Sequence, residues 1–308
     1  EFTQLPMVSV VGDVKHAALV EDVLAREQPN VVFHAAAYKH VPLMEETNAW
    51  QAVRNNAYGT WVIARASVAA KVEKFVLVST DKAVNPTSVM GASKRLAEIV
   101  CQTLQGGGTA FVVVRFGNVF GSAGSVIPRF REQIARGGPV TVTHPDITRY
   151  FMSLSEATQL LLQAGFMGRS GEILVLDMGD PVRILDLARD MIRLSGADPD
   201  RIPIVFTGLR PGEKLYEEVL ASEEATSPTP HPKLRIAGVR EANRDAVGQM
   251  IALCERDRAA GDAEVRARLQ SWIPEYLPPA GAPVKPRPAP APASGDEARA
   301  PTPLRARR

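Results

Sequence analysis

One short polar segment, residues 79–82, carries the groups best suited to chemistry in this chain. Its sequence Ser-Thr-Asp-Lys supplies two hydroxyls, a carboxyl and an amine, and Lys94 supplies a second amine. Met90 and Lys94 are four residues apart, so on a helix they share one face and can both point back toward Thr80. A hydroxyl, a carboxyl and two amines in one small volume could exchange protons with a bound substrate.

The elements around this segment predict how the cluster is positioned. The apolar residues 75–78 before it predict a buried parallel strand, and the residues after it have the pattern of a helix. Polar residues at the carboxyl end of a parallel strand lie where open α/β sheets bind ligands. Strands and helices alternate, which predicts a doubly wound parallel sheet. The predicted strands are 7–11, 31–37, 75–80, 111–115, 140–142, 173–176 and 204–206, and the predicted helices are 15–26, 47–70, 89–104, 125–136, 155–165, 184–194, 244–260 and 263–271.

Composition excludes several classes of protein. The 308 residues are 45% apolar, which is enough for a full core, and the net charge of +2 is too small to argue for nucleic acid as a partner. Cys101 and Cys254 lie far apart, so we expect neither a disulfide framework nor a metal site, which fits a reducing cytoplasm. No apolar run approaches the length of a membrane span, and no signal peptide is visible.

The pattern around Thr80 resembles that of the extended short-chain dehydrogenase/reductase superfamily, in which a strand-end Ser or Thr faces a helix with Tyr-x-x-x-Lys. Here the helix carries Met90 and Lys94 at that spacing. The Asp81-Lys82 pair directly after the Ser-Thr pair is typical of a smaller group within this superfamily. With it, the sequence resembles the UDP-N-acetylglucosamine 4,6-dehydratases of bacterial polysaccharide synthesis. Within that group, Met in place of Tyr resembles the long, membrane-anchored members that retain configuration.

The resemblance implies a Rossmann-like sheet that lacks its first βαβ portion. Such a sheet normally begins with a strand, a glycine-rich turn and a helix that bind pyrophosphate, and no such turn precedes Asp13. We expect about 70 residues to be absent at the front, judging from the size of a βαβ unit, and any membrane anchor, at the cytoplasmic face of the inner membrane, to lie in that missing region. The expected regions are 1–120, a partial NAD-binding domain with the catalytic residues; 121–277, mainly a smaller α/β substrate-binding lobe with interleaved sheet elements; and 278–308, a disordered Pro- and Ala-rich tail.

The resemblance also implies NAD as the cofactor. Asp13 would contact the adenine, with an ordinary turn aspartate as the alternative. Asn56 lies within a predicted helix, where asparagine is unfavourable; it would lie near the nicotinamide ribose, or it is a buried residue that satisfies backbone groups at a helix bend. The small residues at 35–37 would let the backbone approach the cofactor closely. The predicted cofactor-binding residues are Asp13, Val14, Ala35, Ala36, Ala37, Asn56, Ser79, Lys94 and Phe116.

For the substrate, the resemblance implies UDP-N-acetylglucosamine, bound by a protein that forms homo-oligomers. Arg149 and Arg210 each lie in a family-like loop motif, and a guanidinium suits a diphosphate because its donors form a planar fork. Solvated arginines are the alternative, as a solvated loop is for Lys39 and His40. Thr141 and Thr143 would flank the uracil. The predicted substrate-binding residues are Lys39, His40, Asn118, Thr141, Thr143, Arg149, Arg210 and Glu213.

The implied reaction removes water across C5 and C6 of a hexose after transient oxidation at C4. The family assigns Asp81 as the acid for the C6 hydroxyl and Lys82 as the base for the C5 proton, which requires burial to shift their pKa values in opposite directions. Met90 has no proton to exchange, so the C4 hydroxyl proton must leave through Thr80, a water or Asp81. We favour Thr80, with Lys94 holding the nicotinamide ribose. An enzyme inactivated by loss of its Tyr is the alternative.

Three functions follow from these patterns. The first is a hydro-lyase, an NAD-dependent UDP-N-acetylglucosamine 4,6-dehydratase that retains configuration at C5. The second is an inverting 4,6-dehydratase (a 5-epimerase) or another UDP-sugar epimerase, against which Met90 argues. The third is a non-catalytic protein, truncated and able only to bind sugar nucleotides.

Overall fold

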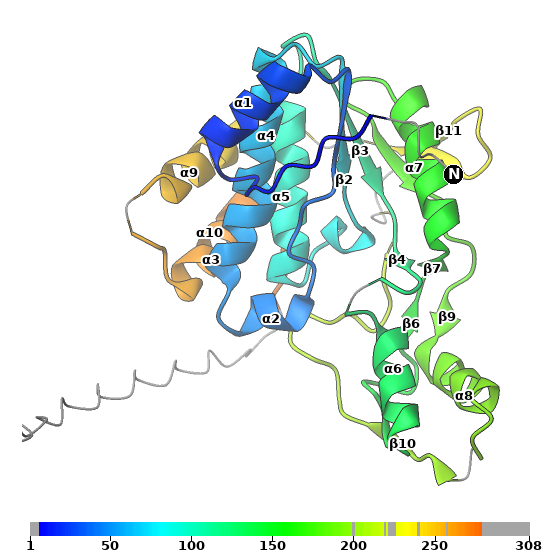
Figure 1. Ribbon diagram of the computed structural model, residues 1–308. Helices are drawn as coiled ribbons and strands as arrows, with labels where there is room; N and C mark the ends of the chain where they lie inside the picture. Colours follow the sequence, from blue (N-terminus) through cyan, green and yellow to red (C-terminus); the bar gives the residue numbers. More distant parts are fainter. Residues whose placement is uncertain are drawn as a thin grey trace, which may run out of the picture.

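The computed structural model describes residues 6–278, with gaps at 123, 199–200, 219, 221–225, 239–240 and 257. Its centre is a six-stranded sheet of order β1-β2-β3-β8-β12-β11 (Figure 1). The first four strands are parallel, as predicted, whereas β12 and β11 are antiparallel to their neighbours. The predicted tail from residue 279 onward lies outside the described residues. The strands are β1 (Val31–His34), β2 (Lys74–Val78), β3 (Ala110–Arg115), β8 (Ile173–Leu176), β11 (Thr226–Pro228) and β12 (Leu234–Ala237).

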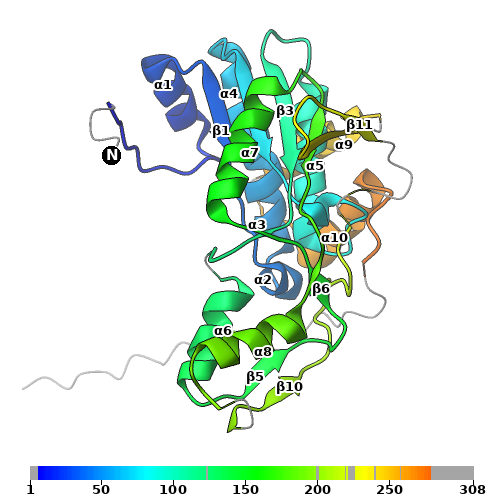
Figure 2. The ribbon, with the colours of Figure 1, turned by 90° about the vertical axis from the view of Figure 1, so that its right-hand side faces the viewer.

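The alternation of side chains along the strands divides the core between the two faces of the sheet. Phe75 and Leu77 of β2 share a cluster with α4 (Gly59–Ala69) and α5 (Val89–Thr103), whereas Val76 shares one with α7 (Leu154–Met167). Successive side chains on a strand point to opposite faces, so a single buried strand serves both clusters. Figure 2 shows α7 in front of the sheet and α4 behind it. This arrangement confirms the predicted Rossmann-like α/β class.

A further group of helices packs behind α5, on the side away from the sheet (Figure 1). It contains Trp272, which is 1% exposed. Arg266 forms an ion pair with Glu45 at 2.6 Å, and Arg95 of α5 pairs with Glu275 at 2.8 Å. These C-terminal helices therefore support the helix that carries Met90. The group comprises α2 (Val41–Glu46), α3 (Ala49–Ala52), α9 (Arg244–Cys254) and α10 (Asp262–Trp272).

A smaller lobe lies below the sheet in Figure 1. Its core is built around Phe130, Val140 and Ile184, which come from α6 (Val126–Ala135), β5 (Val140–Val142) and α8 (Ile184–Leu194). The strand β10 (Ile204–Phe206) pairs in parallel with β5. Two short strand pairs join the lobe to the sheet, so the chain beyond residue 121 serves both parts. These pairs are β4 (Asn118–Val119) with β7 (Phe151–Met152), and β6 (Thr148–Arg149) with β9 (Val182–Arg183).

The structure differs from the sequence-based expectation in two elements at the front of the chain. Residues 7–11 do not form the predicted strand: they pair with no described strand, and Val11 is fully exposed. A strand needs a neighbour to satisfy its backbone groups, and the apolar β-branched composition alone does not supply one. The predicted helix 47–70 is helical throughout most of its length, but the π-helix Val53–Tyr58 interrupts it between α3 and α4. The helix α1 (Ala17–Glu27) forms close to its predicted bounds.

Within the described ranges, no helix combines the length and the apolar composition needed to cross a bilayer. The same residues contain no cluster of three or more His, Cys, Asp or Glu side chains arranged to hold a metal ion.

Candidate active site

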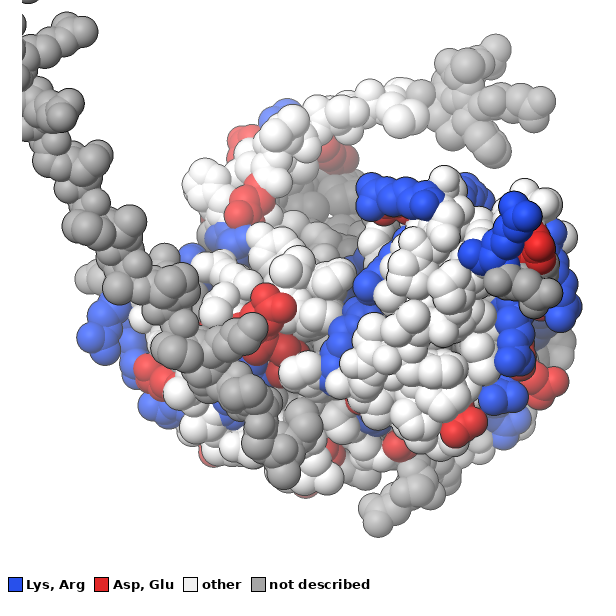
Figure 3. Space-filling view, turned by 90° about the horizontal axis from the view of Figure 1, so that it is seen from below, with Lys and Arg blue, Asp and Glu red and all other residues white. Residues whose placement is uncertain are grey.

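A cavity of about 520 Å³ lies between the carboxyl ends of the parallel strands and the smaller lobe. Seen from below, Lys and Arg side chains border the lobe on several sides (Figure 3). This charge favours an anionic ligand. Most of the predicted site residues line the cavity, although they come from segments up to 178 residues apart, from Ala35 to Glu213. These are Ala35, Ala37, Lys39, His40, Ser79, Thr80, Lys82, Met90, Lys94, Phe116, Asn118, Thr141, Thr143, Arg149, Arg210 and Glu213.

The 3₁₀ turn Asp81–Ala83 follows β2 at the edge of this cavity, and we call it the catalytic turn because it carries the predicted acid and base. Thr80 precedes the turn, and its hydroxyl accepts a weak hydrogen bond from the backbone N–H of Lys82 at 3.4 Å. The same hydroxyl donates to Asp81 Oδ1 at 2.9 Å. The backbone N–H of Asp81 donates to the carbonyl of Phe116 at 3.1 Å, which ties the turn to the end of β3. Thr80 and Asp81 are therefore already joined in one hydrogen-bonded chain.

The helix α5 presses its first turn against the catalytic turn. The hydroxyl of Ser88 caps α5 by accepting from the N–H of Gly91 at 3.0 Å. Gly91 has no side chain where the two segments meet: a β-carbon there would lie 2.2 Å from the carbonyl oxygen of Lys82. The buried carboxylate of Glu45 accepts from the N–H of Val89, so the helix start is held from both sides. These contacts fix Met90 over the turn.

Met90 and Lys94 both line the cavity from one face of α5, as their spacing predicted. Met90 is 4% exposed. Lys94 donates from Nζ to the carbonyl of Val78 at 2.6 Å. Burial lowers the pKa of Lys94 to about 8, with nearby Glu98 acting in the opposite direction. The Nζ of Lys94 is therefore held at the strand end, and the effect of burial on its charged form outweighs the stabilisation from Glu98.

Ser79, next to Lys94, is anchored by a buried ionic cluster. Its hydroxyl donates to Glu98 Oε1 at 2.6 Å. Arg115 contacts Glu98 through two of its nitrogens, at 2.9 and 2.8 Å, and Arg95 contacts it at 3.1 Å. Burial alone would raise the pKa of Glu98, but Arg115 and Arg95 lower it to about 2. This cluster fixes the ends of β2 and β3 relative to α5.

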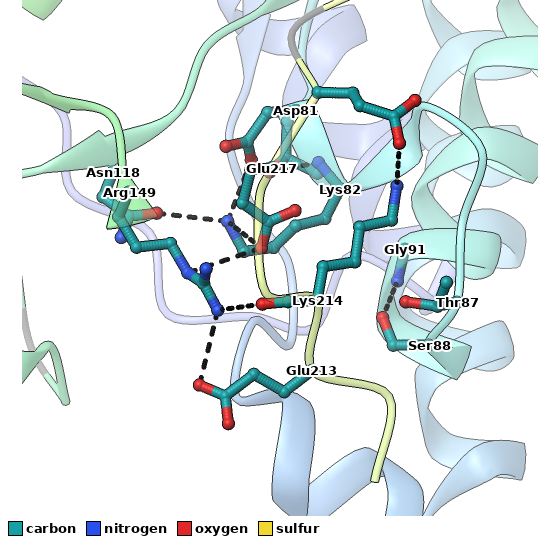
Figure 4. A network of polar contacts seen from close by, with 12 residues as sticks. Asp81, Lys82, Thr87, Ser88, Gly91, Asn118, Arg149, Glu213, Lys214 and Glu217 are labelled. Carbon is teal, nitrogen blue, oxygen red and sulfur yellow. Dashed lines mark hydrogen bonds and ion pairs between the residues drawn. The ribbon is translucent and has the colours of Figure 1, made fainter. Parts of the chain in front are cut away.

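Lys82 lies at the centre of the polar network in Figure 4. Its Nζ donates to Asp81 Oδ1 at 2.9 Å and to Asn118 Oδ1 at 3.1 Å, and it lies 3.5 Å from Glu217 Oε1. Burial disfavours the charge on Lys82, but the carboxylates of Asp81 and Glu217 outweigh it and raise the pKa of Lys82. The sequence-based expectation of a neutral Lys82 is therefore wrong for the ligand-free site. Asp81 contributes most to this rise, and the second carboxylate, Glu217, which the motif did not reveal, adds to it.

Asp81 is completely buried, whereas Lys82 and Thr80 line the cavity. One oxygen of the Asp81 carboxylate accepts from both of these residues, and the other, Oδ2, is buried with no hydrogen-bond partner among the residues that the structure describes. A β-carbon on Gly117 would lie 3.2 Å from this second oxygen. Asp81 thus acts on the cavity through the two side chains that contact it.

Arg149 is held in place by the loop 207–218, which covers one side of the cavity. Its guanidinium donates to the carbonyls of Lys214 and Leu215, at 2.8 and 3.3 Å, and to Glu213 at 3.4 Å. Glu213 also accepts from the hydroxyl of Thr143 at 3.3 Å. The loop in turn donates from Lys214 Nζ to the carbonyl of Val84, behind the catalytic turn. The loop therefore couples the lobe to the catalytic turn.

Lys39 and His40 approach the cavity from the segment that follows β1. His40 precedes α2, and its ring Nδ1 accepts a weak hydrogen bond from the N–H of Leu43 at 3.4 Å. Partial burial lowers the pKa of Lys39. Both residues remain predicted substrate contacts.

Four predicted cofactor residues, Asp13, Val14, Ala36 and Asn56, do not line the cavity. Asp13 accepts from the N–H of Lys15 at 2.9 Å, which is the geometry of a turn aspartate. Asn56 is fully buried in the π-helix. Its amide oxygen accepts from the N–H of Tyr38 at 2.7 Å, and its nitrogen donates to the Tyr38 carbonyl and to Ser93. In this structure Asn56 connects the segment after β1 to α5.

Sequence reasoning did not identify Glu217 as part of the site. It lines the cavity and contacts both Lys82 and Arg149, each at 3.5 Å. A signal exists in the sequence, because Glu217 follows closely after the motif that contains Arg210 and Glu213. Nothing in that spacing shows, however, that the loop turns back to the catalytic turn.

The residues present fit the nicotinamide and ribose end of a dinucleotide. Ser79, Lys94 and Phe116 meet in the cavity with the small residues Ala35 and Ala37, beside which a planar ring has room. The Nζ of Lys94 is a buried donor that suits ribose hydroxyls. Asp13, predicted for the adenine end, lies outside this cavity.

The fold and this site define an extended short-chain dehydrogenase/reductase. The chain is similar to several solved structures, including the following two. The structure of Pen from Bacillus thuringiensis has a TM-score of 0.70 and 31% identity, with 88% of this chain and 83% of that chain covered. The dTDP-glucose 4,6-dehydratase DesIV from Streptomyces venezuelae, solved with NAD bound, has a TM-score of 0.59 at 22% identity, with 86% and 78% covered, and shows the fold alone.

The profile of the polysaccharide biosynthesis protein family matches residues 2–238, and the chain belongs to this family. It is 55% identical over 223 residues to the capsular polysaccharide biosynthesis protein CapD of Staphylococcus aureus. That match covers 72% of this chain but only 37% of CapD, so the chain spans well under half the length of this relative.

Proposed function

We propose that the protein is an NAD-dependent UDP-N-acetylglucosamine 4,6-dehydratase that retains configuration at C5. The observation that carries this proposal is the contact between Asp81 and Lys82, at 2.9 Å, on the cavity edge beneath the helix with Met90. A carboxyl and an amine in contact are the two proton-transfer groups that an elimination of water needs. Neither a simple reductase nor a simple epimerase needs both.

The chemistry requires the sugar to be oxidised first. The C5 hydrogen of a hexose is not acidic, but a ketone at C4 makes it so. NAD⁺, when bound, accepts the hydride from C4 and later returns it to C6. The protein holds this end of the cofactor with Lys94, whose buried Nζ lies at the strand end. Thr80 would accept the C4 hydroxyl proton and pass it to Asp81, to which its own hydroxyl already donates.

The elimination then uses the pair as an acid and a base. The proton received from C4 makes Asp81 neutral, and release of one proton from the partly exposed Lys82 to solvent makes the neighbouring amine neutral. The amine takes the C5 proton, and the carboxyl gives its proton through the hydroxyl of Thr80, which lines the cavity, to the C6 hydroxyl, which leaves as water. The products are a carbon–carbon double bond and the same ionic pair that the free site contains. Return of the proton from Lys82 to the same face of C5 retains the configuration, and Lys82 then regains one proton from solvent.

The walls of the cavity supply groups for a UDP-sugar. Arg149 and Arg210 are the expected diphosphate contacts, and Asn118 places its amide beside Lys82 at the sugar end. Thr141 and Thr143 line the lobe side, where the uracil is expected. The similarity to CapD favours a role in polysaccharide synthesis.

The test is incubation of the complete natural protein with UDP-N-acetylglucosamine and NAD⁺, followed by NMR of the product. We expect a 4-keto-6-deoxy sugar with unchanged C5 configuration and, in D₂O, deuterium at C5. A product inverted at C5 would establish the inverting activity instead. An epimer without loss of water would establish an epimerase. Binding of the sugar nucleotide without any ketone would leave only a non-catalytic binding protein.

A further inference from the structure

The carboxylate of Glu217 is a buried charge that the proposed reaction does not use. Glu217 comes from the loop 207–218, and its side chain is 4% exposed. One oxygen lies 3.5 Å from Lys82 Nζ and 3.5 Å from Arg149 Nε. The other, Oε2, is buried with no hydrogen-bond partner within the described part of the chain. Because burying an unpaired carboxylate oxygen is costly, its presence here points to a role in the site.

Glu217 and Asp81 approach the amine of Lys82 together, and Figure 4 shows the two carboxylates beside it. The charged groups that face Lys82 are Asp81 on its own turn, Glu217 from the loop and Arg149 from β6. Asn118 contributes a neutral amide oxygen at 3.1 Å. Two anions therefore act on one amine, and only Arg149 opposes them. In a partly buried site, such interactions are weakly screened.

We propose that Glu217 is a positioning residue that holds Lys82 in its charged form in the free site and thereby sets the pH at which this amine can act as a base. The consequence for the reaction rests on the proposed function, in which Lys82 removes the C5 proton. The effect on Lys82 itself does not depend on it. Glu217 acts through Lys82 and touches neither of the carbons that react.

The direction of the effect follows from the charges. Asp81 and Glu217 both favour the ammonium form of Lys82, whereas burial and Arg149 oppose it. When the charge of Glu217 is removed, Asp81 is the remaining carboxylate that favours the ammonium form, while the opposing effect of burial is unchanged. The pKa of Lys82 must then fall, so the amine becomes neutral at a lower pH. A purely structural role for Glu217 predicts no such change in the titration of a neighbouring amine.

The direct test measures the titration of Lys82 without any reaction. The ligand-free chain and its Glu217→Gln variant are labelled with isotopic acetic anhydride from pH 6 to 11, and mass spectrometry quantifies the peptide that contains Lys82. Since the Lys82 side chain is 20% exposed, the reagent can reach it. We expect the labelling midpoint to fall by about one pH unit or more in the variant, because a full charge 3.5 Å away is removed.

Three further proteins make the result specific. Glu217→Met has a similar length and no polar atom, so it should give the same fall even if an unpaired amide prevents Glu217→Gln from folding. Glu217→Asp keeps the charge and should stay closer to the wild-type midpoint. Glu218→Gln is the matched control, because Glu218 contacts Asn85 and Lys214, and it should leave the Lys82 midpoint unchanged. An unchanged midpoint in folded Glu217→Gln or Glu217→Met overturns the proposal.

The kinetic test separates this proposal from the proposed function. In the complete enzyme, the acid limb of the kcat/KM profile should move to lower pH in Glu217→Gln by the same amount as the labelling midpoint. If the midpoint falls but wild-type enzyme makes no ketone, the proposed function is wrong and the role of Glu217 stands. If ketone forms and the limb and the midpoint both stay in place, the role of Glu217 is wrong and the proposed function stands.

Discussion

Gly91 and Lys82 meet so closely that no side chain fits between them: a β-carbon on Gly91 would lie 2.2 Å from the Lys82 carbonyl oxygen. The obstacle is backbone, which cannot rotate aside as the end of a flexible side chain can. The position of the catalytic turn under α5 therefore depends on the absence of a side chain at residue 91.

The first prediction concerns this contact. In Gly91→Ala the turn must move away from α5, and a shift of about 1 Å in reacting groups can cost on the order of 100-fold in rate. We expect kcat to fall at least about tenfold and stability to fall by about 1–3 kcal/mol, as in other overpacked sites. Gly248→Ala in α9 is the control, since a β-carbon there meets nothing within 4 Å and should stabilise the helix slightly. Wild-type kcat in Gly91→Ala would show that the turn tolerates displacement.

The second prediction concerns the proton path from C4. Thr80→Ala removes the hydroxyl that donates to Asp81 at 2.9 Å. Loss of a proton-transfer group typically costs about 100-fold or more, so we expect kcat to fall by that order with little change in fold. Thr80→Ser keeps the hydroxyl and should recover most of the rate. Equal rates for the alanine and wild-type enzymes would rule out the relay.

The third prediction concerns Met90. If the thioether takes no part in proton transfer, Met90→Leu should keep kcat close to the wild-type value. The side chain is 4% exposed, and Met-to-Leu exchanges in cores usually cost less than about 1.5 kcal/mol. Steady-state kinetics and thermal unfolding check both parts. A loss of rate as large as that of Thr80→Ala would mean that the sulfur itself is needed.

The fourth prediction concerns Lys94. Its pKa is about 8 in the folded protein and has the ordinary value of 10.5 when unfolded. Between these values the unfolded chain binds more protons, so the free energy of unfolding should rise with pH from about 8 to 10.5. The increment is on the order of 3 kcal/mol at most. Lys94→Met lacks it, so the difference between urea unfolding curves of the two proteins isolates the effect. The prediction would be contradicted if the free energies of unfolding of the two proteins differed by the same amount at every pH from 8 to 10.5.

The fifth prediction concerns the buried cluster around Glu98. Glu98→Gln leaves Arg115 and Arg95 facing a neutral amide, and breaking a buried ion pair from one side typically costs about 3–5 kcal/mol. Urea unfolding at pH 7 should show this loss. The control is Glu132→Gln, which removes an exposed pair with Arg136 and should change stability by less than about 1 kcal/mol. A loss no larger than that of the control would show that the cluster is not what fixes the sheet to α5.

The sequence predicted most of the sheet because its strands are short apolar runs between clear helices. Phe75, Val76 and Leu77 are buried against both helical layers, and a run of apolar residues without alternation is the mark of such a strand. The similar apolar composition of residues 7–11 predicted a strand that does not form, because a strand also requires a neighbouring strand with which its backbone can pair. The antiparallel β11 and β12 were missed because their sequences lack a continuous apolar run.

The relative positions of the candidate site residues could be predicted where motif and local geometry coincide. The four-residue spacing of Met90 and Lys94 is a property of one helix, so it could be inferred directly. Glu217 could not, because its place beside Lys82 depends on the path of a long loop. The direction of the pKa shift of Lys82 was mistaken in part for the same reason: besides the adjacent Asp81, the carboxylate of Glu217, 135 residues further along the chain, raises this pKa, and a local motif does not show it.

The match to the family profile ends at residue 238, but the packing of the folded chain continues beyond it. Trp272 is buried in the layer of helices that packs behind α5. The N–H of Leu277 donates to the carbonyl of Pro86, which follows shortly after the catalytic turn. A gene shortened at the end of the family profile would remove the helices that pack behind α5 and expose the apolar side chains that they cover. Boundaries for expression should therefore follow the folded layers and retain the chain through residue 277.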